Sequence, residues 1–383
     1  MTLTDLCKAR VQTDALFELV RPEAFYDRPI PERHRIVFYL GHLEAFDWNL
    51  LGSRALGRSS FHPSFDRLFA FGIDPDSFGL PQDAASDWPG VAEVRKYNAR
   101  VRQEIDSVFD QIPEQYLHVA VEHRLMHAET FAYMLHNLPY DRKASISAAE
   151  DCDSGAAQHE MVEVPAGRVT LGAPAGEGFG WDNEFRAHDV DVAPFLAGKY
   201  KVTNAEYLEF VSEGAPAPHF WRKTKEGWMY RGVFGEKPLP LHAPVYATHQ
   251  QASSYASSRG KRLLTEAEYQ RAAYVSPADP SRDNFDFRAW DPAPVHRTLP
   301  NRLGLAQMVG NGWEWTSSLF EPFPGFHPFP FYPNYSEPFF DGQHYVIKGA
   351  SPRTAARLTR PSFRNWFRAS YPYVYGTFRL AES

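Results

Sequence analysis

Two histidines one helical turn apart could hold a metal ion. His123 and His127 lie four positions apart in VEHRLMHAETFAYMLHNLP, residues 121–139, a run with few helix breakers. On an α-helix this spacing puts both imidazoles on one face, so both rings can reach a single ion. Glu129 lies roughly 200° around the helix from His127. We therefore expect Glu129 to orient a neighbour from behind rather than to bind the same ion.

A third ligand is needed, and His42 in YLGHLEAFDW is the candidate. It lies on another apolar helical run and could meet the pair in the core of a helix bundle. Three imidazoles with no thiolate suit iron(II), zinc or manganese with open coordination positions. The alternative is that His123 and His127 are partly buried or surface histidines that bind no metal.

Length, charge and cysteine content limit the classes of function that are possible. The 383 residues are enough for two or three domains. A formal net charge of −7 argues against binding to nucleic acid or to an anionic membrane surface. We find neither 18 consecutive apolar residues nor a signal peptide and expect a cytoplasmic protein. Cys7 and Cys152 are too few and too far apart for a disulfide framework or a thiolate metal cluster.

The first part of the chain reads as a four-helix bundle over residues 1–140. Apolar residues recur at helical spacing, and Pro89 and Pro113 mark where two of the helices begin. The expected helices cover residues 3–20, 35–56, 90–112 and 114–137. The long connection over residues 59–88 has a length that suggests a function of its own.

A linker over residues 141–160 and a second domain over residues 161–383 follow. The linker is rich in Ala, Ser, Asp and Gly, and the next residues show short apolar runs broken by Gly and Pro, as in brief strands. Helices are expected over residues 204–213, 249–260 and 265–274, the last beginning with a capping box of Thr265 and Glu268. Residues 319–340, which include Phe323, are rich in Phe, Tyr and Pro. They could line a concave site or pack as a loop on their own side chains.

Five blocks of the second domain resemble the formylglycine-generating-enzyme (C-type-lectin-like) fold. They are GWDNEFRAHDVDV, KVTNAEYLEFV, GKRLLTEAEYQRAA, NRLGLAQMVGNGWEWTSS and YVYGTFRL, in that order. The first domain, with LGH around His42 and HRLMHAE around His123, resembles a DinB-like four-helix bundle. Together they resemble the non-heme iron sulfoxide synthases of ergothioneine and ovothiol biosynthesis over nearly the whole chain. The closest branches are the ergothioneine enzymes and their selenium counterpart, selenoneine synthase.

The resemblance implies an α+β protein with an iron site in the bundle. His42, His123 and His127 would hold iron(II), and O₂ would drive bond formation between C2 of the hercynine imidazole and a thiol or selenium donor. Hercynine is Nα-trimethylhistidine, and the family residue that contacts it matches Asn365. Trp366 beside it could hold the trimethylammonium group by cation–π attraction worth roughly 0.5–2 kcal/mol, or it could be an ordinary core Trp.

Several positions depart from the family pattern. Met126 stands where a Gln often contacts hercynine, and Phe320 stands where a catalytic Tyr supplies a proton or hydrogen atom. Phe367 and Tyr371 stand where an acid and an Arg bind the γ-glutamylcysteine of some branches. An unpaired buried charge costs several kcal/mol, so we expect an uncharged donor such as a selenosugar. The alternative is an ergothioneine-type enzyme that uses γ-glutamylcysteine or cysteine, whose carboxylate would bind one of four arginines: Arg353, Arg357, Arg360 and Arg364.

Three other functions compete with this hypothesis. A formylglycine-generating oxidase needs a reactive cysteine pair in the second domain, and no cysteine follows Cys152. A zinc-dependent thiol transferase, the usual role of isolated DinB-like bundles, does not account for the second domain. A protein that only binds a ligand is opposed by the three histidines and favoured by the loss of the expected Tyr. The predicted partners are small molecules, with neither nucleic acid nor a membrane.

Overall fold

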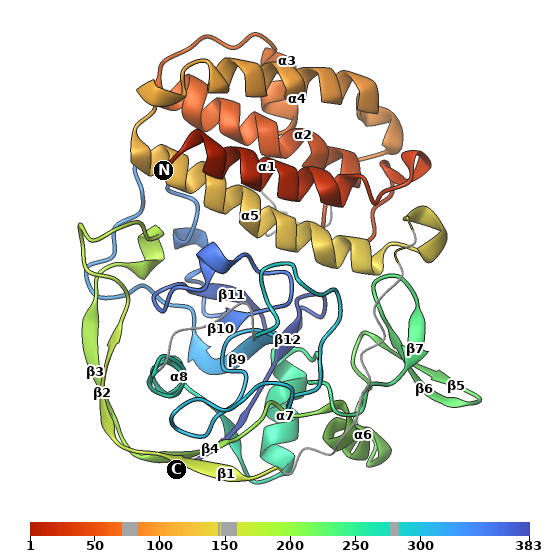
Figure 1. The fold of residues 1–383 in the computed structure, drawn as a ribbon, viewed down its shortest axis with the longest axis vertical. Helices are drawn as coiled ribbons and strands as arrows, with labels where there is room; N and C mark the ends of the chain where they lie inside the picture. The colour runs from red at the N-terminus through yellow and green to blue at the C-terminus, as the bar shows by residue number, and fades with distance from the viewer. Residues whose placement is uncertain (71–82, 145, 147–158, 276–282) are drawn as a thin grey trace. The chain divides into compact units, whose positions relative to one another are not determined.

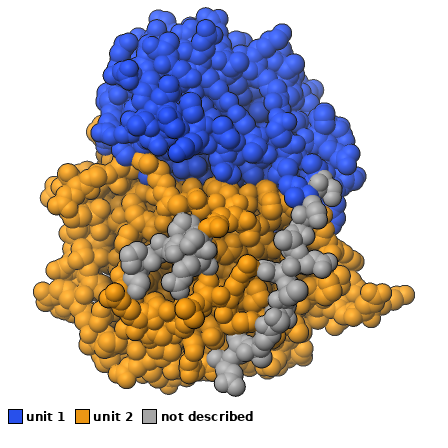
Figure 2. Space-filling view, in the orientation of Figure 1, with its two compact units in different colours: residues 1–147 blue, residues 148–383 orange. Residues whose placement is uncertain are grey.

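The computed structural model describes residues 1–70, 83–144, 146, 159–275 and 283–383. The chain divides into two compact units, Met1–Ser147 and Ala148–Ser383 (Figure 2). The expected linker over residues 141–160 lies largely outside the described residues, so the predicted domain boundaries stay a prediction. Within the described ranges, every helix is too short or too polar to cross a lipid bilayer.

The first unit is the predicted helical bundle (Figure 1). Its helices are α1 (Leu3–Phe17), α2 (Ile36–Asp47), α3 (Pro63–Leu68), α4 (Val91–Asp106) and α5 (Glu114–Asn137). The π-helix Trp48–Ala55 continues α2, and four 3₁₀ turns cover Pro22–Ala24, Ala85–Asp87, Phe109–Gln111 and Tyr140–Arg142. Helix α1 packs on α5, and α2 packs on α4 and α5. Of the long connection expected over residues 59–88, the part over residues 71–82 lies outside the described residues.

Helix α2 runs through the interior of this bundle. Eleven of its 12 residues are buried, which fits a helix that is apolar on nearly all sides. Its buried polar side chains are His42, Glu44 and Asp47. Because buried polar groups are costly unless they are satisfied, each of these three should have a partner or a ligand.

The second unit combines short strands with three short helices (Figure 1). One four-stranded sheet has the order β1-β4-β13-β8, and the other has the order β11-β10-β9-β12. A two-stranded sheet, β2-β3, and a three-stranded sheet, β5-β6-β7, complete the strands found among the described residues. The strands are β1 (Met161–Val164), β2 (Gly167–Leu171), β3 (His188–Val192), β4 (Phe195–Gly198), β5 (Trp221–Thr224), β6 (Gly227–Arg231), β7 (Glu236–Pro238), β8 (Arg262–Leu263), β9 (Gly312–Leu319), β10 (His344–Ala350), β11 (Asn365–Arg368), β12 (Gly376–Thr377) and β13 (Leu380–Glu382).

The three helices of this unit begin at side-chain caps. They are α6 (Asn204–Ser212), α7 (His249–Ser258) and α8 (Glu266–Ala273), and 3₁₀ turns cover Asp182–Glu184, Glu337–Phe339 and Ala356–Leu358. The predicted capping box is present, because Thr265 accepts a hydrogen bond from the backbone N–H of Glu268 while the Glu268 side chain binds back to Thr265. The expected helices of this unit are therefore confirmed to within two residues at their ends. In the first unit, the helices expected over residues 3–20 and 90–112 end earlier, at Phe17 and Asp106.

The sheet that contains β9, β10 and β11 positions several predicted site residues. Strand β10 pairs antiparallel with both β9 and β11, and Trp366 lies opposite Val346. Phe320 directly follows β9, and its backbone N–H donates to the carbonyl of His344. The sheet thus brings residue 320 and residue 366, which are 46 positions apart, to the same part of this unit.

Candidate metal centre

Three histidines converge inside the helical bundle. His42 comes from α2, and His123 and His127 come from α5. One ring nitrogen from each lies within 4.8 Å of the others, and the side chains are 2–4% exposed. The Nε2 atoms of His123 and His127 are 3.1 Å apart. We call these three residues the histidine cluster, and the structure places the predicted ligands together.

The hydrogen bonding of His42 indicates which of its nitrogens is available. Its Nδ1 lies 2.7 Å from the backbone carbonyl oxygen of Phe69. A carbonyl oxygen only accepts hydrogen bonds, so Nδ1 carries the hydrogen and donates it. Nε2 then keeps a lone pair, and it is buried without a hydrogen-bond partner among the described residues. A buried lone pair of this kind can bind a metal ion.

Burial keeps the histidine cluster neutral. It lowers the pKa of His42 to about 4 and holds the pKa values of His123 and His127 well below the ordinary value. The neighbouring imidazoles and the charge of Arg124 lower these pKa values further. At neutral pH the three rings are therefore unprotonated ligands rather than cations that repel a metal.

The spacing fits a metal ion. Two nitrogen atoms that each lie about 2.1 Å from an ion, with a nitrogen–ion–nitrogen angle of roughly 90°, are about 3.0 Å apart. The observed 3.1 Å between the two Nε2 atoms agrees with this value. Three neutral imidazoles leave other coordination positions open, and this set of ligands suits iron(II), zinc or manganese.

Aromatic rings surround the histidine cluster. Phe46 stacks on His123 with ring centroids 3.5 Å apart, and Phe38 stacks on His42 at 4.8 Å. Apolar surroundings fix the direction of each imidazole and limit the access of water, which raises the effect of any charge placed there.

A buried ion-pair network joins the two helices that carry the histidines. Arg124, which directly follows His123, donates to Glu44 at 2.8 Å and to Asp47 at 2.7 Å. Arg102 of α4 also binds Glu44. Burial alone would raise the pKa of Glu44, but Arg124 and Arg102 lower it to about 2. The network therefore pairs the charges of α2 with α5 and holds their register.

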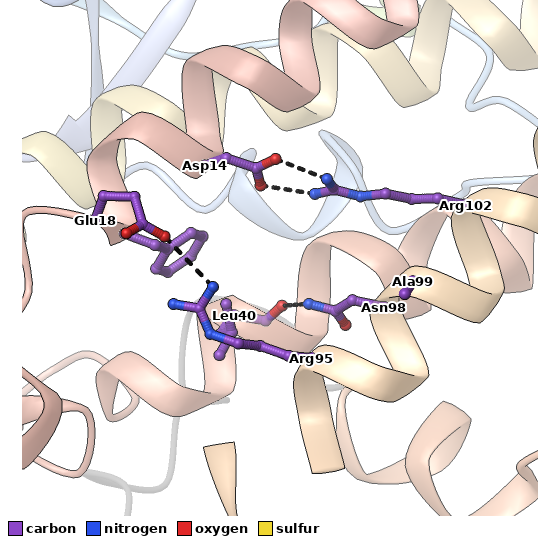
Figure 3. Close-up of a pocket in the computed structure, with 8 residues that line it drawn as sticks. Asp14, Glu18, Leu40, Arg95, Asn98, Ala99 and Arg102 are labelled. Atoms are coloured by element: carbon purple, nitrogen blue, oxygen red, sulfur yellow. Dashed lines mark hydrogen bonds and ion pairs between the residues drawn. The ribbon is translucent and has the colours of Figure 1, made fainter. Parts of the chain in front are cut away.

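A pocket of about 300 Å³ lies between α1, α2 and α4 (Figure 3). Arg102 donates two hydrogen bonds to Asp14 at 2.6 and 2.7 Å, and the Asn98 amide donates to the Leu40 carbonyl at 2.8 Å. The residues that line it are Asp14, Phe17, Glu18, Leu40, Arg95, Asn98, Ala99 and Arg102. This lining includes none of the histidine cluster. The contribution of Asn98 is to fix α2 two residues before His42.

In the second unit, two of the predicted site residues, Phe320 and Trp366, lie in an aromatic cluster. We define this cluster as Phe320, Tyr335, Phe339, Phe340 and Trp366. Phe320 is fully buried and stacks on Trp366 with ring centroids 4.1 Å apart and planes 7° apart. Tyr335 and Phe339 approach Trp366 at 5.4 and 5.5 Å. Within residues 319–340, Phe340 contacts Phe320 and Phe326 with ring centroids 4.9 and 5.0 Å apart. These contacts favour the second of the two interpretations of this stretch, in which it packs on its own aromatic side chains.

The remaining predicted substrate residues are placed as follows. The Asn365 side-chain oxygen accepts the backbone N–H of Trp366 at 2.9 Å. Phe367 and Tyr371 are half-buried and stack with centroids 5.2 Å apart. Phe323 is buried under the guanidinium of Arg364. Met126 is half-buried on α5, directly before His127.

The arginines expected to bind a substrate carboxylate have partners within the second unit. Arg364 donates to both oxygens of Glu266 at 2.9 and 3.1 Å. Arg360 binds Glu184, and Arg353 donates to two backbone carbonyls at 3.0 Å. These bonds use part of the hydrogen-bonding capacity of the three guanidinium groups. That one of the four arginines binds a cysteine carboxylate stays a prediction.

A buried carboxyl group anchors the aromatic stretch. Ser336 donates to Asp182, and the Asn183 amide donates to Ser336 Oγ at 2.9 Å. Burial raises the pKa of Asp182 to about 6, despite the hydrogen bond from Ser336. Trp181 stacks on Tyr335 at 3.9 Å. Sequence reasoning assigned no role to Asp182, although it lies in GWDNE, one of the quoted blocks.

Sequence reasoning also missed two contributions to the histidine cluster. The Phe69 carbonyl belongs to the backbone, so the type of residue 69 does not indicate its role. Arg124 is one of 40 Lys and Arg residues, and its burial was not visible from spacing. Gly41, in the LGH sequence, was the available signal for a close approach to α2.

The comparisons with known proteins agree with this two-part architecture. The DinB superfamily matches residues 6–137, and the sulfatase-modifying factor enzyme 1-like domain matches residues 148–383. A hercynine oxygenase of Mycolicibacterium smegmatis is 30% identical over 99% of this chain and 98% of its own length. The chain belongs to the hercynine oxygenase family. Membership in this family makes it an oxygen-dependent enzyme.

Two further relatives support the same family assignment. The hercynine oxygenase of Mycolicibacterium thermoresistibile is 30% identical over 90% of this chain and 86% of its own length. The ergothioneine biosynthesis protein 1 of Schizosaccharomyces pombe is 27% identical over 96% of this chain and 54% of its own length. The predicted resemblance to these enzymes is confirmed. Their names point to the ergothioneine side of the family and contain nothing specific to selenium.

Proposed function

We propose that the chain catalyses iron(II)- and O₂-dependent bond formation between C2 of the hercynine imidazole and a selenium or sulfur donor. The observation that carries the proposal is the histidine cluster, three buried neutral imidazoles within 4.8 Å of one another, in a member of the hercynine oxygenase family. The small-molecule substrates follow from the names of the relatives. Iron is proposed because the ligand set suits it and because the reaction uses O₂.

The residues of the histidine cluster would perform three tasks. They donate neutral lone pairs, so the site keeps the full dipositive charge of its ion and favours a thiolate or selenolate beside it. The Phe69 carbonyl fixes the direction of His42. The rings of Phe38 and Phe46 limit water. When bound, iron(II) would react with O₂, which none of these side chains can do.

The reaction is balanced by one O₂ per product. The C2–H bond of hercynine and the hydrogen–chalcogen bond of the donor break, while a carbon–chalcogen and a chalcogen–oxygen bond form. The second oxygen atom leaves as water, so the product is a selenoxide or sulfoxide. Of the four electrons that O₂ takes up, two are released when C2 and the chalcogen each lose their hydrogen and join, and two come from the chalcogen lone pair that binds oxygen. The two hydrogens leave in the water.

For the donor, we propose a selenosugar, with cysteine and γ-glutamylcysteine as the ergothioneine-type alternative. Phe367 and Tyr371 stack on each other where charged residues would bind a γ-glutamyl group. Arg360 and Arg364 are paired with Glu184 and Glu266. A donor that carries a carboxylate would therefore find fewer available cations among these residues than a donor such as a selenosugar, which carries none.

The test is a reconstitution of the metal-free protein with iron(II) under anaerobic conditions, followed by O₂ with hercynine and each donor in parallel. We expect O₂ uptake only with both substrates present, one product molecule per O₂, and the highest kcat/KM for the selenosugar. Zinc-loaded protein and the His123→Ala variant are the controls. Iron-loaded protein that consumes no O₂ with any donor would contradict the function, whereas higher activity with a thiol would contradict only the choice of donor.

A further inference from the structure

We propose that the backbone carbonyl of Phe69 is a positioning group for the metal centre and that Gly41 is the residue that permits it. The inference rests on the proposed metal site at the histidine cluster. It concerns how the site is built: Phe69, the C-cap of α3, orients His42, and the missing side chain of Gly41 on α2 lets Phe69 come close enough.

The first step is the hydrogen bond itself. Phe69 is the C-cap of α3, and the last carbonyls of a helix have no partner within it. His42 Nδ1 donates to the Phe69 carbonyl at 2.7 Å, which fixes the tautomer with the hydrogen on Nδ1. The ring then turns Nε2 to the side occupied by His123 and His127, whose own Nε2 atoms are 3.1 Å apart. All three ligands would use Nε2.

The second step is the role of Gly41. A Cβ atom at this position would lie 2.5–2.6 Å from three ring carbons of Phe69, far closer than atoms in contact allow. The Phe69 ring is fully buried and has little room to move aside. Its ring neighbours are Phe38, Phe65, Trp88 and Tyr97. A side chain at position 41 would therefore displace the backbone of Phe69, and with it the carbonyl.

A purely structural explanation makes a different prediction. If the hydrogen bond only satisfied the end of α3, its loss would lower stability and leave the metal affinity of folded protein unchanged. Groups that orient a metal-binding histidine typically change metal affinity by about 10–100-fold when they are lost. Metal affinity measured on folded protein separates the two explanations.

The matched variants are Gly41→Ala and Gly52→Ala. Gly52 lies on the continuation of α2, and a Cβ there would lie 2.8 Å from the ring of Trp48. The steric clash is therefore similar, but it involves no residue of the histidine cluster. We expect the dissociation constant for iron(II) or cobalt(II), measured by competition with a chelator, to rise about 10–100-fold in Gly41→Ala and to stay within twofold of wild type in Gly52→Ala. Equal affinities of Gly41→Ala and wild type would overturn the proposal.

A rescue variant sharpens the test. Phe69→Val removes all three ring carbons that a Cβ at position 41 would touch, while it keeps the backbone carbonyl. The double variant Gly41→Ala with Phe69→Val should bind the metal at least tenfold more tightly than Gly41→Ala alone. A double variant as weak as Gly41→Ala would contradict the steric mechanism.

The tautomer can be measured without any substitution. In metal-free wild-type protein with ¹⁵N-labelled histidine, two-bond ¹H–¹⁵N correlations should show His42 neutral with its hydrogen on Nδ1. A hydrogen on Nε2 would overturn the inference whether or not Gly41→Ala folds. Wild-type protein that binds no metal but shows the Nδ1–H tautomer would refute the proposed metal site and leave the orienting contact established.

Discussion

The histidine cluster is buried throughout, whereas in the aromatic cluster only Phe320 is fully buried and the other four rings are half-buried. The two clusters are also satisfied in different ways. In the aromatic cluster, Phe320 and Trp366 stack face to face, and the rings around them complete the packing. In the histidine cluster, one ring nitrogen from each imidazole lies within 4.8 Å of the others, and Nε2 of His42 is buried without a hydrogen-bond partner among the described residues. Packing alone accounts for the arrangement of the aromatic rings, whereas the arrangement of the histidines indicates that they bind a ligand.

Burial also acts on the two regions with opposite chemical results. It lowers the pKa of His42 to about 4, which keeps a base neutral and ready to bind a metal. It raises the pKa of Asp182, beside the aromatic cluster, to about 6, which makes an acid harder to ionise. In both cases the low dielectric disfavours the charged form. The consequence is a candidate metal ligand in one region and a carboxyl anchor in the other.

The largest expected effect is on the histidine cluster. His123→Ala should abolish stoichiometric metal binding and all activity while the far-ultraviolet circular dichroism stays that of a folded chain, because one of three ligands is lost from a site that the bundle does not need for folding. Metal content after dialysis against iron(II) measures this. His118→Ala, on the same helix but partly exposed, is the control and should keep its metal. Wild-type metal content in His123→Ala would refute the assignment.

The next effect tests the carboxyl anchor through its pH dependence. The folded pKa of Asp182, about 6, lies above the ordinary 3.8. The folded state therefore holds this proton more tightly than the unfolded state, and stability contributed by Asp182 is full below pH 3.8 and lost as the pH rises through 6. The difference corresponds to about 3 kcal/mol at about 1.4 kcal/mol per pH unit.

Denaturant unfolding between pH 4 and 7 measures this loss. Asp182→Asn cannot ionise, so its free energy of unfolding should fall less than that of wild type across this range, by up to about 3 kcal/mol. Asp191→Asn, at an aspartate that is 79% exposed, should follow wild type. Parallel curves for wild type and Asp182→Asn would show that Asp182 keeps an ordinary pKa in the folded protein.

A smaller effect is expected at Trp366. Phe320 covers one face of its ring, so a trimethylammonium group would have to use the exposed remainder of this half-buried side chain. Trp366→Ala should weaken hercynine binding by about tenfold, as expected for a cation–π contact, and leave histidine binding little changed. Calorimetry on zinc-loaded protein gives both constants, with Trp228→Ala as the control. Equal weakening of both ligands would make Trp366 a packing residue only.

The sequence predicted the elements better than it predicted the partners of buried charges. The four long helices and the Thr265–Glu268 capping box follow from periodicity and local hydrogen bonding, which involve residues close in sequence. The meeting of His42 with α5 depends on packing between residues about 80 positions apart. The apolar helical run around His42 made it a candidate ligand, and the family resemblance pointed to the same residue. The pairing of Arg364 with Glu266 is likewise a tertiary contact, so the sequence left that guanidinium available for a substrate. Backbone groups such as the Phe69 carbonyl leave no trace in residue identity.

The smallest expected effect is at Phe320, which stands at the position of the family's catalytic Tyr. A selenolate is more readily oxidised than a thiolate and largely ionised at neutral pH, so a selenium enzyme can dispense with the hydroxyl of the family Tyr. Phe320→Tyr should therefore change kcat/KM for the selenosugar by less than tenfold, the equivalent of about 1.4 kcal/mol, and raise bond formation from thiols. Because Phe320 is fully buried, the added hydroxyl should also cost about 1–3 kcal/mol of stability if it finds no partner. Phe340→Tyr, in the same cluster but half-buried, shows the effect of an added hydroxyl away from residue 320. If Phe320→Tyr abolished the selenium reaction and gave the thiols nothing, Phe320 would be a packing residue, and the proton donor would have to be sought among Tyr332, Tyr335, Tyr371 and Tyr373.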